Sequence, residues 1–313
     1  MSYFSIVLQQ IILFVIYTII GIIAVKCRLL DEDGLKVLSR LILRITIPIM
    51  LFTNTINGAT RAEFLSALPV MAVTVVMYFF LYVIAAVLAK LMHMEGNDGN
   101  VFRASTMFGN IGFVGIPIIS ALFPERGMLY IALFTVIDQM VLWTVGKLLT
   151  SPVDDQKALT PAQVAGKMVN PSTIAIVLAV IFVLTECKLP ALLNKGLTNV
   201  GGLTGVLAMI YMGGLFCYTD ILSYLRRAEI YVEVIVKMIL FPIAFDLFLR
   251  LFPIITQEVR VTMCILTALP TMTTVALFAK DQGSSGEYSA GMLFVNTVIS
   301  MVSLPLICLW LGR

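Results

Sequence analysis

The residues best suited to binding a ligand lie in the middle of an apolar run from about Phe102 to Phe123. The run is long enough to cross a bilayer, yet residues 109–117 read GNIGFVGIP. A proline has no N–H and its ring crowds the preceding turn, so we expect a broken helix with free backbone groups at mid-membrane depth. Close helix packing with a kink at the proline is the alternative interpretation. The candidate binding residues are Asn110, Gly112, Gly115 and Pro117.

A second apolar run, 260–279, has a central proline followed by three hydroxyl side chains. Each break would expose the N-terminus of a half-helix, whose unpaired N–H groups and partial positive charge favour an anion such as a carboxylate. Matching interrupted helices in two halves of a chain are typical of a transporter's binding site. The threonines could donate to the ligand or bond back to their own helix. The candidates here are Pro270, Thr271, Thr273 and Thr274.

Charged residues inside apolar runs are few, and each is a functional hypothesis because it is costly at mid-membrane. Arg44, one turn before Pro48, could face the cavity and bind a carboxylate, or extend to the inner surface. Asp138 could carry a coupling proton or pair with Arg44 or Lys237. Lys237 could also reach the inner headgroups. Asp246 is expected to be solvated near the outer end.

The elements that must position these residues follow from composition. The chain has 313 residues, of which 60% are hydrophobic and 12% charged, and its mean hydropathy is +1.01. Apolar runs of about 20 residues recur from end to end, which indicates an all-α polytopic membrane protein. We expect about ten transmembrane helices, near residues 6–25, 35–53, 68–91, 102–123, 128–150, 170–187, 200–221, 229–250, 260–279 and 288–311.

The polar segment after residue 150 divides five predicted spans from five others. We therefore expect a first repeat at 1–150, a cytoplasmic linker at 151–169 and a second repeat at 170–313. Because five is odd, the second repeat must be inverted in the membrane if it resembles the first. The tripeptide Ala-Leu-Phe occurs at 121–123 and again at 276–278, near the ends of the fourth and ninth spans. Thr160-Pro161 predicts a short surface helix through Met168.

Charge and cysteine usage narrow the class further. The net charge of +3 includes no basic tract that would suggest nucleic acid. The five cysteines have no metal-like spacing, so we expect free core thiols and no cofactor. Lys and Arg are more frequent in the loops that face inward when the N-terminus is placed outside. We therefore expect a multi-pass protein of the cell membrane with both termini extracytoplasmic.

Several segments, in this order, also carry a family resemblance: Leu41 to Phe52 with Pro48, Asn110 to Pro117, Leu142 to Gly146, Asn170-Pro171, Lys237 with Pro242, Ala268 to Pro270 with Phe278 to Lys280, and Leu304 to Leu306. Together they resemble the auxin efflux carrier family, which includes the plant PIN auxin exporters and bacterial malate or malonate carriers. The resemblance implies an inverted five-plus-five fold whose fourth and ninth spans cross. It also implies an elevator-type carrier, with substrate at the crossover between a scaffold and a mobile panel, and a homodimer. Asp138-Gln139 stands where amides are more usual in this family.

The function that fits best is secondary transport by alternating access at the crossover. The cargo would be a small organic anion, a mono- or dicarboxylate such as malate, malonate or an auxin-like acid, and the other partner is the lipid bilayer. A sensor that binds an anion without moving it would use the same site. An intramembrane enzyme would need a nucleophile and base, a metal set or paired carboxylates. The only histidine, His93, lies in a loop, and HExxH does not occur, so we expect no enzyme.

Overall fold

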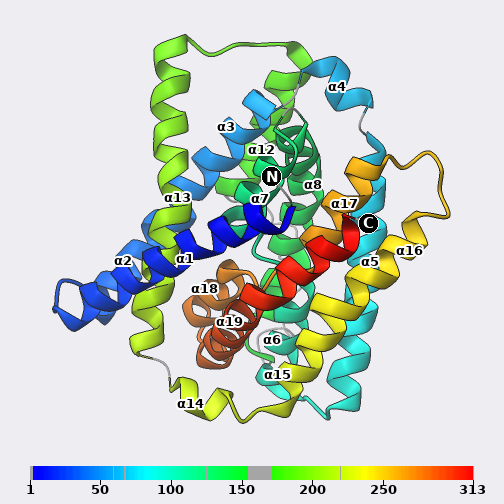
Figure 1. The fold of residues 1–313 in the computed structure, drawn as a ribbon. Helices are drawn as coiled ribbons and strands as arrows, with labels where there is room; N and C mark the ends of the chain where they lie inside the picture. The colour runs from blue at the N-terminus through cyan, green and yellow to red at the C-terminus, as the bar shows by residue number, and fades with distance from the viewer. Residues whose placement is uncertain are drawn as a thin grey trace.

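The computed structural model describes residues 3–58, 60–66, 68–124, 126–153, 171–218 and 220–312. Within these ranges the chain is helical, apart from connections and one β-bridge between Gly109 and Thr271 (Figure 1). The surface helix predicted at 160–168 lies outside the described residues.

The first half contains α1 (Tyr3–Lys26), α2 (Glu32–Leu41), α3 (Ile47–Gly58), α4 (Arg61–Ser66), α5 (Leu68–Leu91), α6 (Gly96–Met107), α7 (Ile116–Leu122), α8 (Gly127–Val141) and α9 (Lys147–Leu149). The second half contains α12 (Pro171–Thr185), α13 (Ala191–Cys217), α14 (Ile221–Tyr224), α15 (Ala228–Glu233), α16 (Phe241–Leu249), α17 (Gln257–Thr267), α18 (Thr273–Asp281) and α19 (Gly286–Leu311). Four π-helical segments join some of these helices: η1 (Ile42–Thr46), η2 (Ile111–Gly115), η3 (Leu142–Gly146) and η4 (Val234–Leu240).

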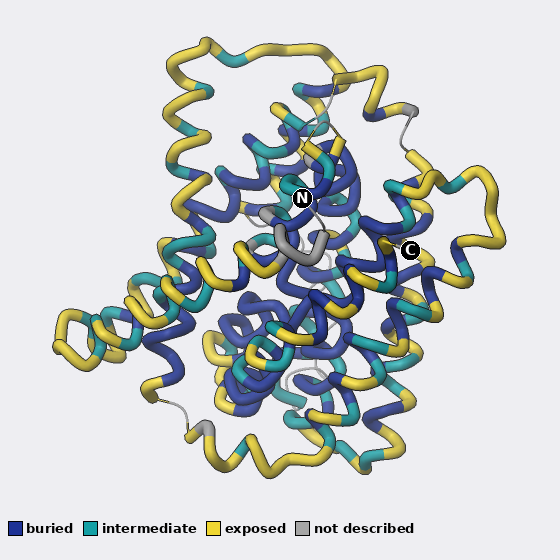
Figure 2. Tube along the Cα trace, viewed as in Figure 1, coloured by how far each residue is buried: buried dark blue, intermediate teal, exposed yellow. Residues whose placement is uncertain are grey.

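Five helical stretches of the described chain are each long and apolar enough to cross a membrane: Leu8–Lys26, Leu68–Leu91, Leu129–Leu149, Ala191–Cys217 and Gly286–Leu311. The apolar helix Pro171–Thr185 is shorter. Large apolar side chains on α1, α5 and α13 are exposed (Figure 2), as expected for surfaces that face lipid rather than water. These features agree with a helical membrane protein. The count of ten spans and the inverted repeat stay predictions.

Three of the four π-helical segments immediately precede a proline. Pro48, Pro117 and Pro242 each occupy the second position of the α-helix that follows η1, η2 and η4. A proline ring crowds the carbonyl four residues back, and its missing N–H leaves one carbonyl without a helical partner. The wider π turn relieves that crowding, so the chain stays helical up to each proline. The sequence reasoning did not predict these π segments.

The helices form two groups. In the first, α1, α2, α3, α12 and α13 pack mainly on one another. In the second, α5 to α9 pack with α15 to α19. We call the boundary between these groups the seam; it is lined by α3 against α8 and by α1 against α7 and α19. Helices α6, α17 and α18 of the second group are the most deeply buried part of the fold (Figure 2).

Glycines bring α1 and α13 into direct backbone contact. A Cβ added at Gly21 would lie 2.1 Å from the Ile210 carbonyl oxygen, and one added at Gly213 would lie 2.0 Å from the Thr18 carbonyl oxygen. No side chain fits at either position. Small residues at such contacts let membrane helices approach closely and gain dispersion energy.

The Ala-Leu-Phe match does not align the two halves in register. The bridge pairs Gly109 with Thr271, and an inverted repeat would relate these two positions. Leu122 lies thirteen residues beyond the first, whereas Leu277 lies six residues beyond the second. The two tripeptides therefore occupy non-equivalent positions, and their match is no evidence for an inverted repeat.

Candidate functional site: a pocket at the helix crossover

Two helices are interrupted at the centre of the second group, and their interruptions pair with each other. The chain leaves α6 at Met107 and is extended to Asn110; it leaves α17 at Thr267 and re-enters a helix at Thr273. The Asn110 N–H donates to the Pro270 carbonyl over 2.8 Å, and the Met272 N–H donates to the Phe108 carbonyl over 2.9 Å. These two bonds satisfy backbone groups that lipid could not satisfy.

The first break lies at the start of the stretch from which it was expected. We expected the glycines, Asn110 and Pro117 to interrupt the helix within 109–117; the interruption lies at Phe108–Asn110, and Pro117 sits in the first turn of α7 instead of at the break. Gly109 is what permits the crossing, because a Cβ there would lie 3.0 Å from both the Leu266 carbonyl oxygen and the Leu269 Cβ. A side chain at position 109 would therefore need the neighbouring segment to move by a few tenths of an ångström, so glycine suits the point where the two segments cross.

The Asn110 side chain reaches across the crossover. Its Nδ2 donates to Thr273 Oγ1 over 3.2 Å, and the residue is only 1% exposed. Its Oδ1 has no hydrogen-bond partner among the described residues. A buried amide oxygen without a partner costs about 1–3 kcal/mol. Thr273 uses one of the two Nδ2 hydrogens, so the second hydrogen, a donor, and Oδ1, an acceptor, remain for a ligand.

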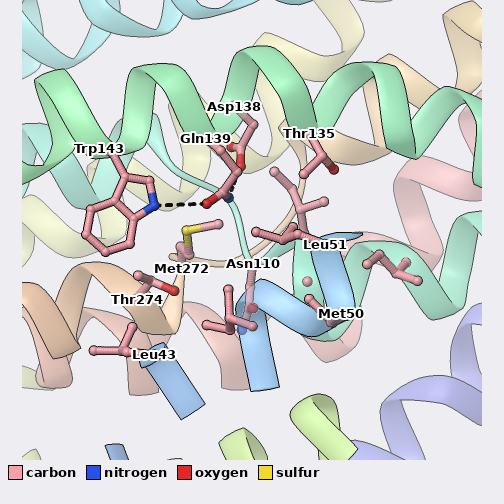
Figure 3. A pocket seen from close by; sticks show the side chains of 14 residues that line it. Leu43, Met50, Leu51, Asn110, Thr135, Asp138, Gln139, Trp143, Met272 and Thr274 are labelled. Carbon is pink, nitrogen blue, oxygen red and sulfur yellow. Dashed lines mark hydrogen bonds between the residues drawn. The ribbon is translucent and has the colours of Figure 1, made fainter. Parts of the chain in front are cut away.

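A pocket opens beside this amide, on the seam between the two helix groups (Figure 3). The empty space in it, counted out to the open mouth and including solvent there, is about 510 Å³. One wall is apolar and comes from η1 and α3; the opposite wall comes from α8 and η3. We call this the central pocket. Its lining is Leu43, Ile47, Met50, Leu51, Asn110, Ile111, Gly112, Ile116, Thr135, Asp138, Gln139, Trp143, Met272 and Thr274.

Asp138 is the charged residue of this lining. It is 1% exposed, and its two carboxylate oxygens accept from the Tyr78 hydroxyl and from Gln139 Nε2, the latter over 2.8 Å. Gln139 Oε1 in turn accepts from Trp143 Nε1 over 3.2 Å (Figure 3). No lysine, arginine or histidine in the described ranges forms an ion pair with Asp138. The expected pairing with Arg44 or Lys237 is therefore wrong.

The predicted crossover residues divide into two sets. Asn110, Gly112 and Thr274 line the central pocket. The others hold the crossover together without lining it: Pro270 accepts from the Asn110 N–H, and Thr271 Oγ1 donates to the Ser105 carbonyl over 3.1 Å. Gly115 packs against the segment that follows α17, where an added Cβ would lie 2.9 Å from Leu269 Cδ1. Thr273 holds the Asn110 amide.

Arg44 does not reach the site. The side chain is exposed and does not line the central pocket. In η1 the neighbouring Leu43 turns toward the pocket instead. The proposed grip of Arg44 on a substrate carboxylate has no basis in this structure, because the residue lies on the outer side of its helix.

Lys237 is buried, which contradicts the expectation that it extends to the headgroups. It is 1% exposed and faces Glu233, which is fully buried, with 3.9 Å between Nζ and Oε1. Asn296 Nδ2 donates to Glu233 Oε2 over 2.9 Å and to Thr271 Oγ1 over 2.7 Å. A charge pair on α15 and η4 is thus connected to the crossover through α19. Sequence reasoning missed Glu233, although its spacing of four residues before Lys237 is a helical pair signal.

Two smaller expectations also fail. Asp246 is fully buried and pairs with Arg250 and Arg260 at 3.0 Å and 2.8 Å, so it is not solvated. All five cysteines are free, but Cys27, Cys187 and Cys217 are exposed, so only the other two are core thiols.

Comparison with known families decides the class. A family described as membrane transport protein matches residues 6–164 and 157–308, nearly the whole chain. The chain belongs to this membrane transport family. The transporter has no match among curated proteins. The family agrees with the resemblance to auxin efflux carriers at this level and with the expectation that the chain is no enzyme. The finer relation to plant auxin exporters or malate carriers stays a prediction.

Proposed function

We propose that this transporter is a secondary carrier that moves a small organic anion, most simply a monocarboxylate with an apolar body, by alternating access at the central pocket. The observation that carries the proposal is the location of the pocket. It lies where two interrupted helices cross and where two helix groups meet. A ligand there touches both groups, so their relative movement changes which side it faces.

The lining favours one carboxylate over two. Asn110 and Thr274 supply neutral polar groups, and α18 begins at Thr273 with its positive dipole end beside the pocket. None of the described lining residues is a lysine, arginine or histidine. A second carboxylate would need a full cation, because an unpaired charge in an apolar cavity is expensive. The apolar wall of Leu43, Ile47 and Leu51 suits a hydrocarbon body.

Asp138 is the residue that we propose to bind the coupling ion, a proton. Two carboxylates 4 Å apart repel by about 4 kcal/mol at an effective dielectric of 20. Asp138 has only neutral donors around it, so an anionic substrate is accommodated when one proton is shared between the two acids. We propose that Asp138 binds this proton and that substrate and proton travel together. Malate and malonate, the dicarboxylates considered from the sequence, fit less well because Arg44 is outside the site.

A liposome assay tests the proposal. The purified protein is reconstituted, and uptake of labelled indole-3-acetate, malonate and malate is measured with and without an inward proton gradient. We expect accumulation of the monocarboxylate above equilibrium only with the gradient. Binding of an acid, measured as thermal stabilisation, without any flux would instead favour the sensor. Transport of sugars or cations in preference to acids would contradict the proposal.

A further inference from the structure

A second cavity adjoins the central pocket on one side. It lies between α1, α3 and α13 over the start of α7, and its lining includes the polar side chains of Gln10, Tyr17, Asn54 and Thr198. Its empty space is about 800 Å³ up to the open mouth. None of the described lining residues is charged. We call this cavity the glycine chamber, because Gly201, Gly202 and Gly205 of α13 also line it.

The chamber and the central pocket share three lining residues: Met50, Gly112 and Ile116. A Cβ added at Gly112 would lie 3.4 Å from Met50 Cε. The end of the methionine side chain therefore packs against Gly112, which has no side chain of its own. Methionine is unbranched and changes rotamer readily. Of the three residues between the two cavities, Met50 of α3 therefore has the most readily moved side chain.

A third cavity lies between α2 and α18 and shares no lining residue with the other two. Its lining includes Lys36 and Arg40 of α2 and Lys280 of α18, with Glu32 and Asp281. Lys280 Nζ lies 3.4 Å from Glu32 Oε1, so an ion pair joins the two sides of the seam there. The continuous helix formed by α2, η1 and α3 lines all three cavities. From Lys36 to Asn54 it rises roughly 27 Å, close to the hydrocarbon thickness of a bilayer.

We infer that the glycine chamber is filled with water and binds the transported acid before or after the acid occupies the central pocket. The acid passes between the two cavities when the Met50 side chain moves. This inference rests on the proposed function. The cavity at α2 and α18 is lined by three cations and two acids, and its Lys36 and Lys280 are each in an ion pair. The glycine chamber instead offers the acid neutral polar groups. A lipid chain is the competing occupant, and the experiment below separates the two.

The glycines allow an unusually clean test. A Cβ at Gly202 or Gly205 would meet no heavy atom within 4 Å, and the same holds for Gly196 on the same helix. Gly196 does not line the chamber. Larger residues at these positions therefore keep the helix, since glycine is a poor helix former. Gly205→Leu places a side chain into the chamber, and Gly196→Leu is its matched control outside it.

Thiol labelling decides what fills the chamber and needs no transported substrate. In a background with the five native cysteines replaced, Gly205→Cys and Leu203→Cys in liposomes are treated with the anionic reagent 2-sulfonatoethyl methanethiosulfonate. Leu203 is 52% exposed on the outer face of the same helix. We expect Gly205→Cys to react at least tenfold faster. Equal rates would mean a lipid-filled groove and would overturn the inference.

Flux measurements decide whether the acid passes through. Gly205→Leu should lower flux of labelled indole-3-acetate at least tenfold. Flux in Gly196→Leu should stay within twofold of wild type. Unchanged flux in Gly205→Leu would overturn the inference while the proposed function stands. Absence of flux in the wild type would instead defeat the proposed function, and the labelling result would still decide whether the chamber holds water.

Discussion

The Asn296 side-chain amide donates to the Thr271 hydroxyl over 2.7 Å, and the Thr271 hydroxyl donates to the Ser105 carbonyl. One threonine thereby joins α19, α6 and the extended segment that forms the crossover. The other hydrogen of the amide goes to Glu233, so the buried charge pair is mechanically connected to the site. Substitution of Asn110, which lines the central pocket, should mainly affect binding. Substitution within the charge pair should mainly affect stability, because it leaves a buried charge without its partner.

Asn110→Ala should weaken acid binding tenfold or more, because a buried hydrogen bond to a charged group contributes about 1.5–3 kcal/mol. The protein should remain folded. The measurement is thermal stabilisation by indole-3-acetate over a concentration series. Asn97→Ala is the control, since Asn97 accepts from the Val153 N–H and does not line the central pocket. Wild-type affinity in Asn110→Ala would exclude this amide from the site.

Asp138→Asn should abolish accumulation driven by a proton gradient while exchange of internal for external acid continues. The amide cannot take up a proton, but it keeps the size and most of the hydrogen bonds of the carboxyl group. Flux of labelled acid in liposomes, with and without a gradient, separates the two activities. Asp220→Asn, in an exposed connection, should behave as wild type. Gradient-driven accumulation in Asp138→Asn would assign the coupling elsewhere.

Arg44→Gln should change monocarboxylate flux less than twofold, because Arg44 is exposed and outside the central pocket. The same liposome assay measures it. A loss of transport with normal expression would show that Arg44 enters the site in another conformation of the carrier.

Lys237→Met should destabilise the protein by about 3–5 kcal/mol, because it leaves Glu233 buried without its counter-charge. The double variant Glu233→Gln with Lys237→Met should recover most of that loss, since no isolated charge remains. Thermal unfolding in detergent gives both values. Equal stability of the single and double variants would mean that the pair contributes little as a pair.

Gly213→Ala should lower stability clearly, because its Cβ would lie 2.0 Å from the Thr18 carbonyl oxygen and would force α1 away from α13. Gly196→Ala on the same helix should be neutral or slightly stabilising, as it meets no atom within 4 Å. Thermal unfolding compares the two alanines directly. An intact melting temperature in Gly213→Ala would show that the two helices can separate at little cost.

Sequence reasoning located the site better than it assigned roles within it. Hydropathy and the Gly-Pro pattern pointed to the crossover, and Asn110 and Thr274 do line the central pocket. Which side of a helix a charge faces depends on its neighbours, so Arg44 was misplaced and Lys237 was not recognised as buried. Tyr78 escaped notice because an aromatic residue in an apolar run carries no signal. Its partner, Asp138, lies 60 positions away and only the fold joins them.

The two backbone hydrogen bonds of the crossover also affect how the protein inserts into the membrane during synthesis. The Asn110 N–H and the Phe108 carbonyl find their partners in Pro270 and Met272, about 160 residues later. During synthesis the first half of the protein enters the membrane with these groups exposed to the lipid or bound to water, because their partners at 270 and 272 have not yet been made. A nascent chain that stops before α17 should therefore insert its fourth span incompletely and remain a target for membrane chaperones and proteases. The last third of the polypeptide would then be needed before the first third reaches its final depth.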